Sequence, residues 1–305
     1  MAESLTSDQQ YAIRLARAKD AYQRNNIRII DSSVRGCAWL VTTPRGIFGV
    51  SDNAAKLIVQ GWFFGIHRHH DIILAFENCG RQDRTTEMGR IIKLRIDDGS
   101  LVDPQVLTSG LHNHCHQLAV IDGLICLLDT ENQAVLRFTL EGQAVDVRRP
   151  FPAAPVLDQT GAYVHMNALA QVGDRLAVML HNGGAEPKKF SELAWLDRDW
   201  TLIERHSLPG HCCHDIVEDE HDVIWHCSTM SGDIIGSDGT RINITDQLMT
   251  RGLALGSEAI AVGVSTFGPR GTRDRLPGGV VILDRSWKKR VQIPLPAPAS
   301  DIIAL

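Results

Sequence analysis

The stretch Gly110-Leu-His112-Asn-His114-Cys-His116-Gln-Leu-Ala-Val-Ile-Asp-Gly123 introduces a pattern that recurs along the chain. In each recurrence a polar or charged residue stands directly before a short apolar run. This position is occupied in turn by His116, Asn167, His214, Arg251 and Ser300. The intervals from each of these residues to the next are 51, 47, 37 and 49 residues. Short strands that repeat with a period in this range are typical of a radial repeat architecture.

The sequence around these positions alternates between short apolar runs and tight-turn residues, which predicts strands in groups of four. We predict five such groups. They span residues 62–107, 116–147, 168–207, 215–245 and 253–293. The fourth group is the shortest, and an alternative with five blades arises if it merges with a neighbour.

The strands left over at the two ends of the chain complete a sixth group. One is Asp301–Leu305, and three more fall between Val34 and Gln60. Pairing the two ends would close the ring and remove the exposed sheet edges. The fold class is therefore predicted to be all-β, a six-bladed β-propeller closed by its N- and C-terminal strands.

Composition and the N-terminal segment complete the prediction of organisation. Residues 1–26 are predicted to form a short helical extension, with a helix from Ser7 to Arg24, and residues 27–305 the propeller domain. The net charge of −5 gives no indication of a nucleic-acid partner. No apolar run is long enough to span a membrane, and the N-terminus is not of secretory type. The expected location is therefore the cytoplasm. An odd number of cysteines, seven, does not indicate a disulfide framework, so we expect reduced thiols.

The first strand of each propeller blade lines the central channel, so the recurring position is expected to form a ring at one funnel. Counting back along the chain places Gly61 in the same ring. Because side chains on one face of a strand recur every two residues, His114 and His165 are expected one layer above His116 and Asn167. Several imidazoles that converge from separate blades favour a transition-metal site. The predicted ligands are His114, His116, His165 and His214, and the predicted cofactor is iron or copper, with zinc or manganese as alternatives.

Three further residues near the funnel are assigned catalytic roles. Arg251 would bind a negatively charged group, because a guanidinium binds carboxylate, sulfate or phosphate through two parallel hydrogen bonds. Asn167 would orient an imidazole or supply an oxygen ligand, and His112 would contact the substrate.

The loops that join the second and third strands open on the same face and are unusually polar. Five of their residues are assigned to substrate binding: Glu77, His181, His226, Arg270 and Arg273. A solvated loop held by salt bridges is the alternative interpretation of the two arginines.

The histidine funnel resembles the arrangement in carotenoid cleavage oxygenases, where histidines from separate blades hold an axial iron ion. It is also similar to that of oligogalacturonate lyases, where channel histidines and a divalent metal act in β-elimination from an acidic sugar. Both families are generally built on seven blades. The segments Thr250–Gly256 and Val262–Arg270 are similar to bacterial propellers of unassigned function, which implies no particular activity.

These observations predict a metal-dependent enzyme, an oxidoreductase or oxygenase acting on a small polar or anionic substrate. One alternative is a metal-dependent lyase or isomerase that acts next to a carboxylate. Three other interpretations remain open: a metal-free acid–base site, a purely structural polar channel, and a non-enzymatic propeller that binds a protein or glycan. Neither a nucleic acid nor a membrane is expected as a partner, and the sequence does not specify an oligomeric state.

Overall fold

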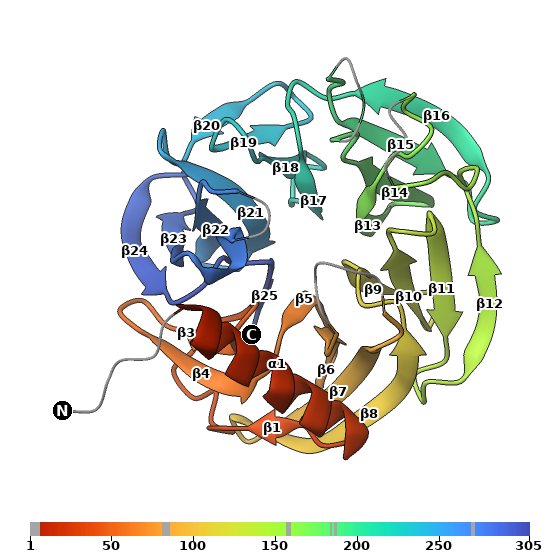
Figure 1. Cartoon of the computed structure of the whole chain (residues 1–305). Coiled ribbons are helices and arrows are strands. Elements are labelled where there is room, and N and C mark those ends of the chain that lie inside the picture. Colours follow the sequence, from red (N-terminus) through yellow and green to blue (C-terminus); the bar gives the residue numbers. More distant parts are fainter. Residues whose placement is uncertain (1–6, 81–85, 157–159, 184, 186–187, 270–271) are drawn as a thin grey trace.

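The computed structural model of the chain describes residues 7–80, 86–156, 160–183, 185, 188–269 and 272–305. Its strands form six sheets arranged as blades around a common axis (Figure 1). The predicted six-bladed propeller is therefore confirmed, and the five-bladed alternative is not.

Five blades are regular antiparallel sheets of four strands that follow one another along the chain. Blade 1 contains β5 (Phe63–His69), β6 (Ile72–Asn78), β7 (Gly89–Asp97) and β8 (Ser100–Leu111). Blade 2 contains β9 (Leu118–Ile121), β10 (Leu124–Asp129), β11 (Ala134–Phe138) and β12 (Ala144–Arg148). Blade 3 contains β13 (Met166–Val172), β14 (Arg175–Leu180), β15 (Glu192–Leu196) and β16 (Leu202–Ser207). Blade 4 contains β17 (His214–Glu218), β18 (Ile224–Ser228), β19 (Asp233–Gly236) and β20 (Arg241–Asn243). Blade 5 contains β21 (Leu248–Leu255), β22 (Ala259–Thr266), β23 (Gly278–Asp284) and β24 (Lys289–Leu295).

The sixth sheet, here called the closing blade, joins the two ends of the chain as predicted. Its strands are β25 (Asp301–Ala304), β2 (Trp39–Thr43), β3 (Gly46–Val50), β4 (Ala55–Gln60) and the two-residue β1 (Arg28–Ile29). The pairing of β2 with β25 places Val41 opposite Ile302. The short outer strand β1, which pairs with β4, was not predicted because two residues carry no periodicity.

The hydrophobic core is divided into layers between neighbouring blades. Between blade 5 and the closing blade, for example, Val41 and Ile302 pack with Val280 and Ile282. Each sheet is covered on both faces, which explains why the strands inside a blade are much more buried than the outer ones. The strand β2 is entirely buried, whereas the outer strand β16 is exposed throughout.

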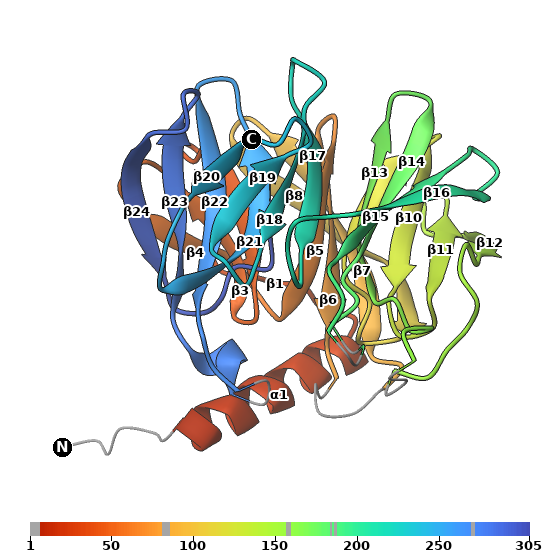
Figure 2. The ribbon, with the colours of Figure 1, turned by 90° about the horizontal axis from the view of Figure 1, so that it is seen from above.

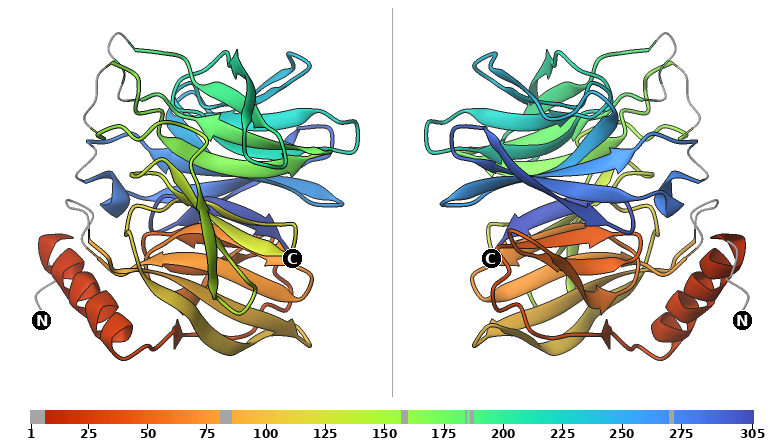
Figure 3. Two further views of the ribbon diagram at one scale, coloured as in Figure 1. Left: turned by 90° about the vertical axis from the view of Figure 1, so that its right-hand side faces the viewer. Right: turned by 90° about the vertical axis from the view of Figure 1, so that its left-hand side faces the viewer.

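The one α-helix among the described residues, α1 (Ser7–Gln23), lies against one face of the propeller (Figures 2 and 3). The Tyr22 hydroxyl donates to the carbonyl oxygen of Glu87 at 3.1 Å and accepts from the backbone N–H of Gly110 at 3.0 Å. The buried side chain of Arg90 donates to the carbonyl oxygens of Ala21 and Asn26, at 3.3 and 2.8 Å. These bonds fix the end of α1 on blade 1.

Two further properties bear on the cellular context. Each of the seven cysteines is a free thiol. No helix in the described ranges combines the length and the apolar character that a membrane span requires.

The closure of the ring can be tested with a substitution in β25. Ile302 is 3% exposed and packs between two blades, so Ile302→Ala is expected to lower the free energy of unfolding by about 2–5 kcal/mol. The matched control is Ile203→Ala in the outer strand β16, where the side chain is 49% exposed and the expected change is below about 0.5 kcal/mol. Urea unfolding followed by tryptophan fluorescence measures both, and equal losses would contradict the role of β25.

Candidate functional site

A small cavity lies on the propeller axis, and the recurring sequence position supplies half of its lining. The cavity has a volume of about 10 Å³, which is room for about one water-sized group. Its lining comprises Phe64, Gly65, His116, Gln117, Asn167, His214, Asp215, Arg251, Ser300 and Asp301. The structure therefore brings together the five residues that the sequence pattern placed in one ring.

In blade 1 the ring position is occupied by Gly65 and not by Gly61. A bulge between Phe63 and Ile66 shifts the register of β5. A Cβ atom on Gly65 would lie 2.6 Å from the carbonyl oxygen of His116, so this close approach requires glycine. Gly65 precedes His116 by 51 residues, the same interval that separates His116 from Asn167, and this interval could have identified it.

Four imidazole rings follow one another beside the axis. The ring centroids of His116 and His165 are 5.2 Å apart, those of His165 and His181 are 4.6 Å apart, and those of His181 and His214 are 5.3 Å apart. His181, assigned from its loop to substrate binding, is thus a member of this cluster. The ring of His114 instead has its Nδ1 atom 2.9 Å from a carboxylate oxygen of Glu131.

The sequence predicted His114, His116, His165 and His214 as metal ligands. Across residues that the structure describes, no group of three or more His, Cys, Asp or Glu side chains is arranged to hold a metal ion.

The two histidines that line the cavity share the same hydrogen-bonding arrangement. The Nδ1 atom of His116 lies 2.9 Å from the carbonyl oxygen of His114, and the Nδ1 atom of His214 lies 2.8 Å from that of Cys212. A carbonyl oxygen only accepts, so each Nδ1 carries the hydrogen and each neutral ring keeps its lone pair on Nε2. Burial, and next the nearby Arg251 cation, hold the pKa of both imidazoles well below 6.5. Both rings are therefore neutral at pH 7.

Arg251 is a buried cation at the same cavity. Burial lowers its pKa to about 10, so the guanidinium remains charged at neutral pH. Within the described part of the chain, its Nε atom and the Oδ1 atom of Asn167 are buried without a hydrogen-bond partner. The amide nitrogen of Asn167 donates to the carbonyl oxygen of Cys213 at 2.8 Å, which fixes the orientation of the amide. One donor and one acceptor at the axis are thus available to a ligand.

A pair of buried carboxyl groups, Asp215 and Asp301, was not identified from the sequence. Each follows a ring residue directly and was interpreted as part of a strand. Burial raises the pKa of Asp215 to about 6 and that of Asp301 to about 8, and the charge of Asp215 contributes to the second shift. The nearby Arg251 cation opposes both shifts. Asp301 also accepts hydrogen bonds from the backbone N–H groups of Ile66 and Ile302, at 3.1 and 2.9 Å.

The remaining predicted residues do not line the axial cavity. Glu77 forms a buried ion pair with Arg90 at 2.7 Å, and its exposed fraction is 2%. His226 lies within β18, where burial lowers its pKa to about 4. Its Nε2 atom is buried and has no hydrogen-bond partner within the described ranges.

Two of the last three assigned residues, His112 and Arg273, are described by the structure. The Nδ1 atom of His112 is 3.3 Å from the amide nitrogen of Asn132. Arg273 begins the short 3-10 helix η1 (Arg273–Arg275), and its charge is among the influences that lower the pKa of Arg251. Arg270 lies outside the described residues.

Comparison with known proteins identifies the fold but no family. No family model matches the chain, and no curated protein is similar enough in sequence to be matched. A chain of the nidogen–laminin complex superposes with a TM-score of 0.62 and 11% identity, covering 88% of this chain and 98% of that one. A gluconolactonase from Xanthomonas campestris superposes with a TM-score of 0.57 and 15% identity, over 90% and 86% of the two chains. A protein of unknown function from Bacteroides caccae gives 0.56 and 12%, over 88% and 99%. At these identities the similarity shows the propeller architecture alone.

The carboxyl pair predicts an unusual dependence of stability on pH. In the folded protein Asp301 holds its proton up to about pH 8, whereas an unfolded carboxyl releases it near pH 4. The folded state therefore binds more protons between these values, and the free energy of unfolding should fall as the pH rises through this window. Urea-unfolding midpoints between about pH 5 and 8 measure this fall. The fall should be smaller in the Asp301→Asn variant and unchanged in Asp52→Asn, an exposed control. An equal fall in the unmodified protein and both variants would refute the raised pKa of Asp301.

Proposed function

We propose that this protein is an enzyme that binds a small carboxylate or related oxyanion at the axial cavity and transfers a proton at the adjacent carbon. The reaction would be an elimination or an isomerisation. One observation carries this proposal: a buried Arg251 cation, with an Nε donor lacking a partner among the described residues, shares a small cavity with two neutral imidazoles.

The size of the cavity limits how a substrate would bind. With about 10 Å³ available, one charged oxygen would enter and accept a hydrogen bond from Arg251, while the rest of the substrate remained in the funnel. The amide oxygen of Asn167 would accept a hydrogen bond from a substrate hydroxyl group. Both groups are held in place by buried surroundings, so they are preorganised for binding.

The chemical step would use the lone pair on Nε2 of His116 or His214. The carbon–hydrogen bond next to the carboxylate breaks, the proton moves to Nε2, and the electron pair enters the carboxylate as an enediolate, whose charge Arg251 stabilises. In an elimination this electron pair then forms a carbon–carbon double bond as a leaving group departs. In an isomerisation the proton returns to the opposite face of the same carbon or to a different carbon atom. An anionic substrate favours the imidazolium form, so its binding would raise the low pKa of the base.

The structural comparisons are compatible with an enzyme but do not select this reaction. A gluconolactonase shares the architecture, and so does a chain of the nidogen–laminin complex. Propellers serve both catalysis and binding, so the proposal depends on the axial residues.

Hydrogen exchange in heavy water tests the proposal directly. Small hydroxy-, keto- and uronic carboxylates are incubated with the protein, and loss of the α-proton signal is followed by NMR, with the matching amides as ligand controls. We expect exchange for at least one carboxylate and none for its amide. Arg251→Gln should weaken binding by about tenfold or more, because a charge-assisted hydrogen bond is lost.

Variants of the two imidazoles separate binding from chemistry. One of the two variants, His116→Gln or His214→Gln, removes the base and should abolish exchange of the α-proton. Saturation-transfer NMR should still detect binding of the carboxylate to that variant. Thermal unfolding of each variant shows whether it is folded. Equal binding of acids and amides, or no exchange for any carboxylate, would leave the non-enzymatic binding propeller as the better interpretation. Exchange that survives both substitutions would show that neither imidazole is the base.

A metal-dependent reaction is the second candidate, because four imidazoles succeed one another at ring-centroid distances of 4.6–5.3 Å. In the described residues these rings are not arranged around an ion, so the side chains would have to turn to hold one. His116, His165, His181 and His214 are the residues that would approach such an ion, with iron or copper favoured. The ion would supply a Lewis acid, or a redox centre that uses dioxygen as oxidant.

Elemental analysis tests this second candidate on protein purified without a histidine tag. About one iron or copper ion per chain, resistant to dialysis and lost in the His116→Ala, His214→Ala double variant, is the result expected for a metal enzyme. A His69→Ala, His70→Ala double variant, at the end of β5 and in the turn that follows, is the matched control and should retain the ion. Metal that is substoichiometric and indifferent to both substitutions would rule out this candidate.

A further inference from the structure

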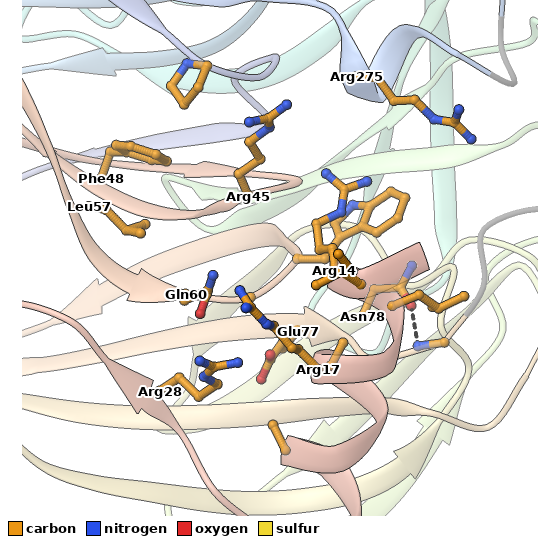
Figure 4. Close-up of a pocket in the computed structure, with 18 residues that line it drawn as sticks. Arg14, Arg17, Arg28, Arg45, Phe48, Leu57, Gln60, Glu77, Asn78 and Arg275 are labelled. Carbon is orange, nitrogen blue, oxygen red and sulfur yellow. Dashed lines mark hydrogen bonds between the residues drawn. The ribbon is translucent and has the colours of Figure 1, made fainter. Parts of the chain in front are cut away.

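A second and much larger cavity lies between α1 and the propeller face, at the junction of the closing blade and blade 1 (Figure 4). Its volume is about 490 Å³, a size typical of sites for small molecules. It shares no lining residue with the axial cavity. It is therefore a separate potential binding site, unrelated to the proposed chemistry.

Five arginines from four different segments line this cavity: Arg14 and Arg17 of α1, Arg28 of β1, Arg45 of the β2–β3 turn, and Arg275 of η1. Figure 4 shows these side chains around the same space. Arg14 and Arg17 are three residues apart, so they lie on the same face of α1. The convergence of cations from segments far apart in sequence is a property of the fold and not of one basic run.

The positive charge of this cavity is not balanced by its own lining. Glu77, the one carboxylate in the lining, already forms a buried ion pair with Arg90 at 2.7 Å. Among the residues that the structure describes, Arg17, Arg28 and Arg45 form no ion pair. The carboxyl group of Asp274 lies near Arg14 and Arg275, so the positive charge without an ion-pair partner among the described residues is that of Arg17, Arg28 and Arg45. Like charges that are brought together in this way favour the binding of an anion.

Other residues of the lining are apolar or aromatic. Phe48 and Leu57 of the closing blade contribute to it, together with Trp62 at the start of blade 1. The guanidinium carbon of Arg14 lies 5.0 Å from the centroid of a Trp62 ring, a cation–π contact that holds this arginine over the aromatic surface. A ligand that fits both parts must combine an oxyanion with an apolar body.

We propose that this cavity, the arginine pocket, binds a small molecule in which a phosphate or carboxylate group is attached to an aromatic or aliphatic body. Guanidinium groups bind either oxyanion through paired hydrogen bonds. The apolar body packs against Phe48, Leu57 and Trp62. Because α1 forms one wall, the bound molecule contacts the helix and two blades at the same time.

The dye anilinonaphthalene sulfonate, an anion on an aromatic body, serves as the probe. We expect its fluorescence to rise on binding to the folded protein. The Arg17→Gln, Arg45→Gln double variant should bind it about tenfold more weakly or worse, since each lost charge-assisted hydrogen bond is worth about a factor of ten. The uncharged analogue phenylnaphthylamine should bind both proteins within about twofold, because the aromatic wall is unchanged.

The matched control is the Arg24→Gln, Arg35→Gln double variant, which removes the same charge from exposed residues outside the pocket. It should bind the dye within about twofold of the unmodified protein. If circular dichroism shows that the pocket variant is misfolded, the single variant Arg28→Gln replaces it. This variant should bind the dye about three- to tenfold more weakly than the unmodified protein.

Competition identifies the oxyanion. Displacement of the dye by naphthyl phosphate at lower concentration than by naphthoate indicates a phosphate ligand, and the reverse order indicates a carboxylate. Three results would overturn the proposal. Neither naphthyl compound displaces the dye, or the two double variants lose dye affinity equally. The third is that the pocket variant loses affinity for the uncharged analogue as much as for the dye. The hydrogen-exchange assay at the axis is independent, since Arg17 and Arg45 do not line that cavity.

Discussion

The pairing of β25 with β2 is the constraint on which the rest of the structure depends. It joins residues that are 259 positions apart, as the hydrogen bond from the Thr42 hydroxyl to the carbonyl oxygen of Asp301 illustrates. Once the ring is closed, the first strand of each blade is held at a fixed place around the axis. Side chains that are distant in the sequence then meet without any local interaction between them. The axial cavity is therefore a product of closure, and its geometry depends on every blade being present.

Closure also determines the electrostatics of the axis. The strands that meet there bury a cation and two carboxyl groups close together, so each affects the others. Burial favours the neutral carboxyls, while Arg251 favours their ionised forms. The imidazoles respond in the same way and remain uncharged. The Arg251 cation is buried beside uncharged bases, and the neighbouring carboxyl groups offset its charge only in part. This arrangement is unfavourable for folding alone and is characteristic of a functional site.

The architecture could be predicted from the sequence because every blade repeats the same alternation of apolar runs and turns, and the leftover strands at the two ends required a partner. The ring residues followed from the same repeat. What the sequence did not reveal depends on three-dimensional contacts. The bulge in β5 moved the ring position to Gly65, and His181 reached the imidazole cluster from the end of an inner strand. Asp301 was interpreted as an ordinary strand residue because a buried carboxyl in a strand has no distinctive pattern. The arginine pocket escaped prediction because the docking position of α1 is not encoded in its periodicity.

The distance along the chain between β2 and β25 has a consequence for biosynthesis. At about 5–20 residues per second, a ribosome needs roughly ten to fifty seconds to make the segment between these strands. Throughout that interval the inner edge of β2, a wholly buried apolar strand in the finished ring, has no neighbour to hydrogen-bond with. An open apolar edge of this kind promotes self-association, so the nascent chain would benefit from a chaperone until the last blade is complete.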